Sequence, residues 1–148
     1  MEITNAKFED LSKILELQKL SYLSEAEIYN NYSIQPLLQT LDELEKEFEK
    51  STILKLLDDN NEIIGSIRSY EENNRVYIGK LIVNPDCQNR GFGTKLLYAI
   101  EKIFPNKTYE LFTGSKSEKN LYLYKKLGYK EFKREMVADN LEIIFMEK

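Results

Sequence analysis

The stretch that decides the fold is LIVNPDCQNRGFGTKLL, residues 81–97 of the 148-residue chain. It passes from an apolar segment typical of a buried strand, through a loop with two glycines, into a segment whose apolar residues have helical spacing. The first N–H groups of a helix have no intrahelical partner, and the helix dipole adds positive charge beside them. A glycine loop that enters a helix is therefore a site for anions, and Gly91 and Gly93 predict either a phosphate cradle or a plain tight turn.

The spacing around these glycines excludes two common nucleotide motifs. A Rossmann fingerprint needs a small residue three positions after Gly93, where this chain has Leu96. A P-loop needs Gly-Lys-Ser/Thr, whereas Gly93 is followed by Thr94 and Lys95. On spacing alone, a turn and a phosphate loop remain equally good interpretations.

The N-terminal part of the chain predicts a short strand at Ile3–Asn5 and two helices. Apolar residues recur at helical spacing from about Phe8 onward: Leu11, Ile14, Leu15, Leu17 and Leu20. The segment from Ser24 to Pro36 has no clear period and is expected to be a connecting loop. Pro36 suits the first turn of a second helix. This helix would present Leu37, Leu41, Leu44 and Phe48 on one face.

The middle of the chain changes to strand-like patterns separated by short polar turns. The expected strands are Thr52–Leu57, Glu62–Tyr70 and Arg75–Val83, and their short connections predict an antiparallel meander. A helix from Phe92 to Pro105 should follow the glycine loop, and the next strand, Tyr109–Thr113, should lie parallel to the one before the loop.

The C-terminal part predicts one more helix and a hairpin. Ser115-x-x-Glu118 has the pattern of a capping box, and Gly128 should end the helix that starts there. YKEFKRE and LEIIFMEK would form the last two strands. The fold class is therefore α+β, with a mixed sheet of about seven strands and about four flanking helices in a single domain, residues 1–148.

Composition limits the classes of function. The charge is 21 − 25 = −4 without a basic block, so we expect no nucleic-acid partner. No apolar run approaches the roughly 20 residues that span a bilayer, and the start does not resemble a signal peptide. We therefore expect no membrane association and a cytoplasmic location.

The chain has no histidine and a single cysteine, Cys87. This excludes Ser-His-Asp and Cys-His catalysis and a disulfide within the chain, and we expect no metal site. Proton chemistry must come from Tyr, Asp, Glu, Lys, Cys or water, and Cys87 is expected to be an incidental thiol.

Two segments together resemble a known family. LIVNPDCQNRGFGTKLL is similar to the Q/R-x-x-G-x-G/A signature of the GNAT superfamily of acyl-CoA-dependent N-acyltransferases, and NLYLYKKLGYKEF resembles that family's Tyr-x-Lys-x-Gly-aromatic signature. The two segments have the family's order and separation, and the predicted elements match the family over nearly the whole chain.

The resemblance implies that acetyl-CoA lies between two parallel strands that splay apart. The pantetheine arm would bind the backbone near Leu81, Ile82 and Val83. Asn120 and Tyr124, four residues apart on one helix face, would point toward the thioester. The residues implied to hold the pyrophosphate are Gln88, Asn89, Arg90, Gly91, Phe92, Gly93 and Thr94.

The family reaction is direct attack of a free amine on the thioester, with no covalent enzyme intermediate. Tyr124 corresponds to the residue that assists the leaving sulfur, and a hydrogen bond to that sulfur is the role that we expect. Some relatives have a glutamate base on the fourth strand, at the position of Tyr77 here. The base is therefore open between an ordered water chain and a carboxylate on the acceptor side; the candidates are Glu25, Glu27 and Glu71.

We expect the acceptor to be a primary amine of a small molecule or peptide. Its pocket should be lined by Tyr29, Tyr32, Gln39 and Tyr77. A monomer or a homodimer is expected. The alternative is a catalytically weak or inactive acyl-CoA-binding regulatory module, which the missing strand-four glutamate would suit.

Overall fold

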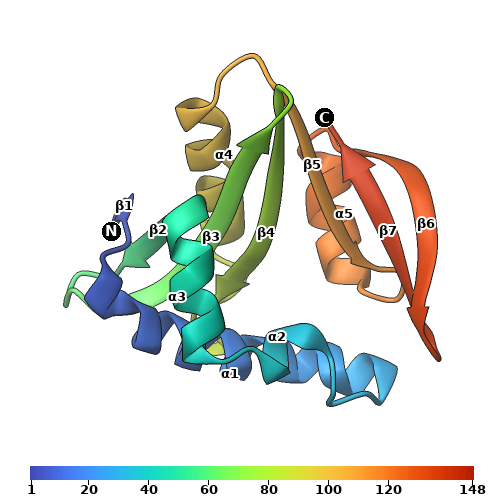
Figure 1. Ribbon diagram of the computed structural model, residues 1–148, viewed down its shortest axis with the longest axis horizontal. Helices are drawn as coiled ribbons and strands as arrows, with labels where there is room; N and C mark the ends of the chain where they lie inside the picture. The colour runs from blue at the N-terminus through green and yellow to red at the C-terminus, as the bar shows by residue number, and fades with distance from the viewer.

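The computed structural model describes residues 1–148. Seven strands form one mixed sheet, and five α-helices and two short 3₁₀ helices surround it (Figure 1). The strands are β1 (Glu2–Asn5), β2 (Thr52–Leu57), β3 (Ile63–Glu72), β4 (Arg75–Val83), β5 (Thr108–Gly114), β6 (Lys130–Ala138) and β7 (Leu141–Glu147). The helices are η1 (Phe8–Asp10), α1 (Leu11–Tyr29), α2 (Gln35–Leu38), α3 (Leu41–Lys50), η2 (Pro85–Cys87), α4 (Phe92–Ile103) and α5 (Glu118–Lys126).

The strand order is β1-β2-β3-β4-β5-β7-β6. The first four strands pair antiparallel, which confirms the predicted meander, and β4 and β5 pair parallel across α4. That parallel pairing is short, because it runs only from Arg75 opposite Thr108 to Tyr77 opposite Glu110. Beyond this point the two strands diverge, and they form the two arms of a V in Figure 1.

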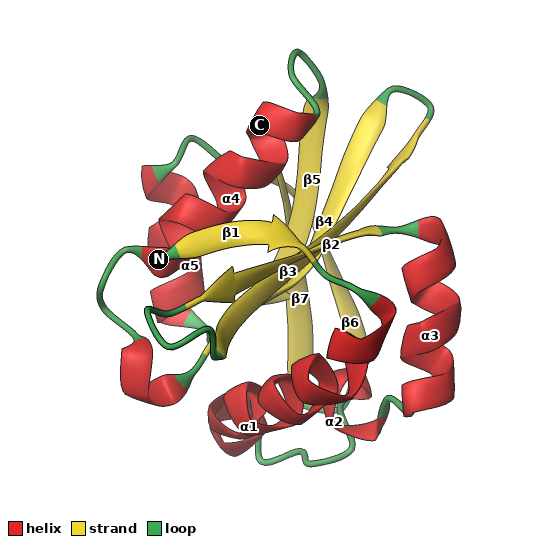
Figure 2. Ribbon diagram, turned by 90° about the vertical axis from the view of Figure 1, so that its left-hand side faces the viewer, coloured by secondary structure: helices red, strands yellow, loops and turns green.

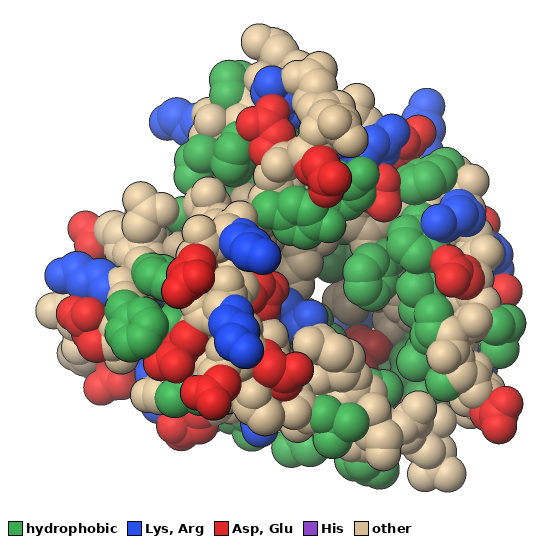
Figure 3. Space-filling view, viewed as in Figure 1, with side chains coloured by type: hydrophobic (Ala, Val, Ile, Leu, Met, Phe, Trp, Pro, Cys, Tyr) green, Lys and Arg blue, Asp and Glu red, His purple; other side chains and the backbone are tan.

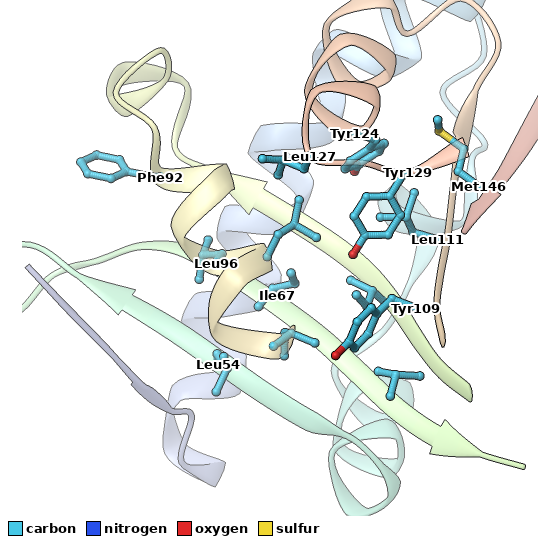
Figure 4. Close-up of a cluster of buried hydrophobic side chains, with 14 of the residues drawn as sticks. Leu54, Ile67, Phe92, Leu96, Tyr109, Leu111, Tyr124, Leu127, Tyr129 and Met146 are labelled. Carbon is cyan, nitrogen blue, oxygen red and sulfur yellow. The ribbon is translucent and has the colours of Figure 1, made fainter. Parts of the chain in front are cut away.

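Helices cover both faces of the sheet. In Figure 2, α4 and α5 lie on one side of the sheet and α3 on the other, with α1 and α2 across its lower end. The core under α4 and α5 is a cluster of 17 buried residues, part of which is drawn in Figure 4, and the core under α1 and α3 is a cluster of six. Leu96, Leu97 and Ile100 of α4 are fully buried, and each such side chain contributes about 1.5–3 kcal/mol.

Three local predictions were wrong. The segment from Ser24 to Tyr29 is not a loop but the last part of α1, which ends at Asn30 in a left-handed conformation with φ 47°. Only Ala26 and Tyr29 are buried in this part of the helix, and the residues around them are polar or exposed. The segment therefore shows no extended apolar period. The adjacent asparagines are therefore the helix stop rather than part of a long loop.

The second predicted helix is two helices, interrupted at Gln39 and Thr40. Thr40 caps α3 by accepting a hydrogen bond from the Glu43 N–H, while the Glu43 carboxylate accepts from the Thr40 N–H at 2.9 Å. This capping box is a local start signal that competes with continuous apolar spacing.

The cap of α5 is Ser117 and not Ser115. The Ser117 hydroxyl makes no cap hydrogen bond, because it is bound to side chains of α1. Gly128 ends the helix as predicted, with φ 98°. None of the helices, α1 included, has the length and apolar character that crossing a membrane requires.

Candidate functional site

A cavity of about 880 Å³ opens where β4 and β5 part. Its walls come from the ends of β4 and β5, from α1 and α5, and from β7. Figure 3 shows the surface hollowed between the body of the molecule and the β6–β7 side. The opening joins the α4–α5 side of the sheet to the α1–α3 side, so groups from both faces line one space.

One wall is the free edge of β4. Leu81, Ile82 and Val83 line the cavity, and none of them is paired to β5. This edge begins at a bulge, where Lys80 and Leu81 both lie opposite Ile67 and Lys80 has φ 49°. A bulge bends the strand that carries it, which fits the divergence of β4 from β5. The Val83 carbonyl accepts a hydrogen bond from Gln88 Nε2 at 3.3 Å, which fixes the loop that follows.

That loop presents a run of free backbone N–H groups. No protein group accepts a hydrogen bond from the amides of residues 88–94. Asn89 and Gly91 have φ of 65° and 78°, and Gly91 is the N-cap of α4. Left-handed residues within such a run turn successive N–H groups toward a common point, which makes an anion-binding nest. The side chains of this loop are Gln88 at the cavity wall, exposed Arg90 and buried Phe92.

Gly93 is fixed by its contact with α5. A Cβ placed there would lie 3.3 Å from Cδ2 of Leu123 and 3.8 Å from Cδ2 of Leu81. Glycine thus allows the start of α4 to pack closely against both α5 and β4.

Tyr124 of α5 lies on the other side of the opening. Its side chain is only 6% exposed, lines the cavity and packs next to Tyr129, with ring centroids 6.1 Å apart (Figure 4). Burial raises the pKa of Tyr124 above its ordinary value, and Tyr22 and Glu25 raise it further. The Tyr124 hydroxyl has no hydrogen-bond partner within the protein, and its raised pKa keeps it protonated, so it is available to donate to a ligand in the cavity.

Glu25 of α1 is the carboxylate beside Tyr124. It accepts hydrogen bonds from Ser117 Oγ and, at 3.4 Å, from Asn120 Nδ2, and Asn120 also donates to Thr113 Oγ1 at 3.3 Å. These bonds fix the Glu25 carboxylate at the cavity wall and leave further lone pairs free to accept a proton or a hydrogen bond.

Tyr29 joins the end of α1 to the segment between β5 and α5. Its hydroxyl lies 3.0 Å from Ser117 Oγ and accepts a hydrogen bond from the Lys116 N–H at 2.8 Å. A Cβ at Gly114 would lie 1.9 Å from the Tyr29 hydroxyl, so only glycine fits there. The contact sets the position of Glu25 one helical turn earlier.

A buried polar network surrounds Arg68 of β3, which is itself one of the residues that line the cavity. Arg68 is 2% exposed and donates through Nη1 to Gln39 Oε1 at 3.2 Å and to Glu47 at 3.1 Å, and through Nη2 to Gln18. Burial lowers the pKa of Arg68, and Glu47 opposes that shift. The Arg68 Nε has no partner.

The residues expected in the acceptor pocket have different positions. Tyr77 lines the cavity and stacks on Tyr70, with ring centroids 5.0 Å apart at 16°. Tyr29 also lines it, although its hydroxyl is engaged. Gln39 belongs to the buried network of Arg68 and is not among the lining residues. Tyr32 is 57% exposed and lies outside the cavity.

Of the three candidate bases, only one lines the cavity. Glu25 lines the cavity, whereas Glu27 is exposed outside it. Glu71 is also outside it, and forms an ion pair with Lys107 at 2.8 Å. The side chains that line the cavity without having been singled out from the sequence include Tyr22, Glu47, Arg68, Lys80 and Ser117. The structure brings together no cluster of three or more metal-ligating side chains.

Residues 23–148 match the family model described as the acetyltransferase (GNAT) domain. The chain belongs to the GNAT acetyltransferase family. The resemblance inferred from the two sequence motifs and the α+β fold with its mixed sheet are thereby confirmed.

Solved structures with the same fold cover almost the whole chain. The smu.2055 protein of Streptococcus mutans has a TM-score of 0.83 and 16% identity, and the alignment covers 100% of this chain and 98% of that one. The PaiA N-acetyltransferase of Thermoplasma acidophilum, in complex with coenzyme A, has a TM-score of 0.78 and 19% identity over 99% and 98% of the two chains.

The spermidine N-acetyltransferase of Vibrio cholerae, in complex with CoA and spermine, has a TM-score of 0.76 and 18% identity, covering 99% and 94%. At these identities the likeness concerns the fold. A search of curated proteins found no match to this chain.

Proposed function

We propose that residues 1–148 act as a single acetyl-CoA-dependent N-acetyltransferase domain that acetylates a primary amine of a small molecule or peptide. The observation that carries the proposal is the opening between β4 and β5, which brings the free edge of β4, the Tyr124 hydroxyl and the Glu25 carboxylate into one cavity. The amine attacks the thioester directly, with no acetylated enzyme as intermediate.

The coenzyme is held mainly by backbone groups. The pyrophosphate binds the free amides of residues 88–94 at the start of α4, where the helix dipole also favours negative charge. The pantetheine arm lies along residues 81–83 as an added strand beside β4. Asn120 and the side chain of Gln88 line the same path.

Tyr124 stabilises the leaving sulfur by donating a hydrogen bond. A thiol has a pKa of about 8.5 and a phenol a pKa of about 10, so the thiolate is a weaker base than the phenolate. Proton transfer from tyrosine to the thiolate is therefore uphill even in water. Burial raises the pKa of Tyr124 and makes that transfer still less favourable. A hydrogen bond from the intact hydroxyl therefore suits the site better than full proton transfer.

Glu25 is the base in this proposal. An alkylammonium has a pKa of about 10.4, so its deprotonation at neutral pH costs roughly 4–5 kcal/mol. Glu25 replaces the strand-four carboxylate of some relatives, whose position is occupied here by Tyr77. Ser117 and Asn120 hold the carboxylate, which accepts the proton of the amine directly or through a water.

The competing function is a binding module that keeps the coenzyme but does not turn it over. The binding-module alternative was supported by the absence of a carboxylate on β4. Glu25 of α1 provides a carboxylate at the cavity wall, which weakens that support. The solved relatives include an N-acetyltransferase bound to CoA and spermine, which agrees with an amine as acceptor.

The test is a screen of amines with acetyl-CoA, in which thiol release is followed and the acetylated product is identified by mass spectrometry. We expect at least one primary amine to give both signals. Coenzyme binding with no turnover across a broad panel of amines, amino acids and peptides would establish the binding module instead. The proposal also includes a cytoplasmic location and a monomer or homodimer, which cell fractionation and light scattering test.

A further inference from the structure

Lys80 is a cation of the cavity wall that has no protein partner. It follows Gly79 at the bulge of β4 and lines the cavity, yet it takes part in none of the protein's ion pairs or side-chain hydrogen bonds. Burial lowers the pKa of Lys80, and the neighbouring Arg68 lowers it further, whereas Glu47 raises it. A half-buried ammonium without a counter-ion costs free energy, which a bound anion would recover.

The surroundings of Lys80 carry one surplus positive charge. Arg68 and Lys80 contribute +2 and Glu47 contributes −1. Glu47 forms its ion pair with Arg68, at 3.1 Å, so the charge of Lys80 is the one left without a partner. Arg68 binds Gln18 of α1 and Glu47 of α3, so its head group lies on the α1–α3 side of the sheet. Lys80 interacts electrostatically with both Arg68 and Glu47, which places the three groups together, away from the amide nest at the start of α4. An anion bound by Lys80 would therefore be a group other than the pyrophosphate.

The opposite charge lies at another part of the same cavity. Glu25 and Tyr124 line the same space, and Tyr22 of α1 lines it within electrostatic range of both Glu25 and Arg68. Burial raises the pKa of Tyr22 to about 12. Glu25 raises this pKa further and Arg68 lowers it, so Tyr22 interacts electrostatically with both groups. A ligand with an amine at Glu25 and an anion at Lys80 would match both.

We propose that the acceptor carries an anionic group beside its reactive amine, and that Lys80 binds this group while Glu25 receives the amine. A single surplus charge fits a carboxylate, so the substrate class is an amino acid or a related aminocarboxylate. An aminoalkyl phosphate has the same anionic chemistry. Polycationic amines are poor acceptors, because Lys80 repels their second ammonium group. This inference rests on the proposed acetyltransferase function.

The experiment measures kcat/KM for acceptors in matched pairs. One arm compares amino acids with their carboxamides, and a second compares an aminoalkyl phosphate with the corresponding amino alcohol. Each pair is tested with the wild-type protein, with Lys80→Met, and with Lys126→Met, which removes an exposed lysine of α5 outside the cavity. Coenzyme affinity of each variant is measured separately by calorimetry.

The wild type should prefer the anionic member of at least one pair by about 10- to 100-fold, the effect of one charge-assisted contact. Lys80→Met should abolish this preference with coenzyme affinity unchanged, and Lys126→Met should keep it. The arm with the larger preference identifies carboxylate or phosphate.

Two outcomes would overturn the inference. Turnover without a preference, or with a preference that Lys80→Met leaves intact, would remove Lys80 from acceptor binding and leave the acetyltransferase function standing. Turnover of neutral or polycationic amines only would exclude an anionic acceptor. Failure of the coenzyme to bind at all would instead contradict the proposed function itself.

Discussion

The two sides of the cavity are built from different parts of the chain. On the α4 side, the polar groups are backbone amides of one continuous loop, residues 88–94. On the α1 side, they are side chains from separate elements: Glu25 from α1, Arg68 from β3 and Lys80 from β4. A backbone site needs particular conformations, which glycines at fixed spacing provide, so it leaves a motif in the sequence. A side-chain site needs only that distant residues meet, so it leaves no contiguous motif.

This difference also separates what the two sides do. A backbone site binds a ligand common to a whole family, whereas exchange of a few side chains alters the acceptor and leaves the coenzyme site intact. Substitutions on the α4 side should therefore change coenzyme affinity. Substitutions on the α1 side should change turnover or the choice of acceptor. The following predictions test that separation, beginning with the largest effect.

Gly93→Asp should weaken coenzyme binding by about 1,000-fold, or about 4 kcal/mol, because a carboxylate would compete with the pyrophosphate for the amides at the start of α4. An aspartate in the first turn suits the helix dipole, so the fold should survive. Calorimetry with acetyl-CoA, together with circular dichroism, measures both effects.

Gly93→Ala is the matched control, since its methyl group meets the same Leu123 side chain without adding charge. It should keep most of the affinity. Equal losses in the two variants would mean that packing, and not the anion site, explains the result.

Glu25→Gln should lower kcat by about 100-fold, the usual contribution of a positioned general base. Acetyl-CoA affinity should be unchanged, because Glu25 belongs to the acceptor side. Steady-state kinetics with a saturating acceptor measures the loss. Glu27→Gln, two residues along α1 and exposed, serves as the control. Similar rates in both variants would exclude Glu25 as the base.

Tyr124→Phe should lower kcat by about 30-fold, or about 2 kcal/mol, the value of one hydrogen bond to a charged sulfur. The ring still fills its place in the core, so stability and coenzyme affinity should hardly change. Tyr122→Phe alters an exposed tyrosine of the same helix, 71% accessible, and should have no effect. A fully active Tyr124→Phe protein would show that the hydroxyl is only a packing group.

The pH–rate profile should show the smallest effect, which is the absence of an alkaline decline. Tyr124 acts in its protonated form, and burial raises its pKa above the ordinary 10, so the required form persists as the pH rises to 10. Activity should rise with pH while the amine loses its proton and then level off. A decline between pH 8 and 9 that disappears in Tyr124→Phe would contradict this assignment.

The sequence could predict most of the fold, because alternating and helical patterns identify the strands and α4, and Gly128 identifies the end of α5. It misplaced the end of α1 since that segment faces the cavity with polar side chains and has no apolar stripe. The break before α3 did have a signal, the Thr40-x-x-Glu43 capping box, which was outweighed by the spacing of the leucines.

The site could be predicted only where it has a local motif. Gln88–Thr94 and Tyr124 lie in such motifs; of these residues, Gln88 and Tyr124 line the cavity, and Gly93 lies against Leu81 of its wall. Arg68 and Lys80 did leave a weak signal, a charged residue in the interior of each of two largely apolar strands, and Gly79 before Lys80 is typical of a bulge. Tyr22 and Ser117 had none, because only the packing of α1 against the β5–α5 segment brings them to the cavity.

The most direct test varies acetyl-CoA and an amine acceptor together and measures the initial rate of thiol release. Direct transfer within one cavity predicts that release depends on both substrates and that the double-reciprocal lines intersect, as they do when both substrates bind before reaction. Parallel lines would indicate an acetylated enzyme. Release that does not depend on the amine would contradict acetyl transfer between the two sides of this cavity.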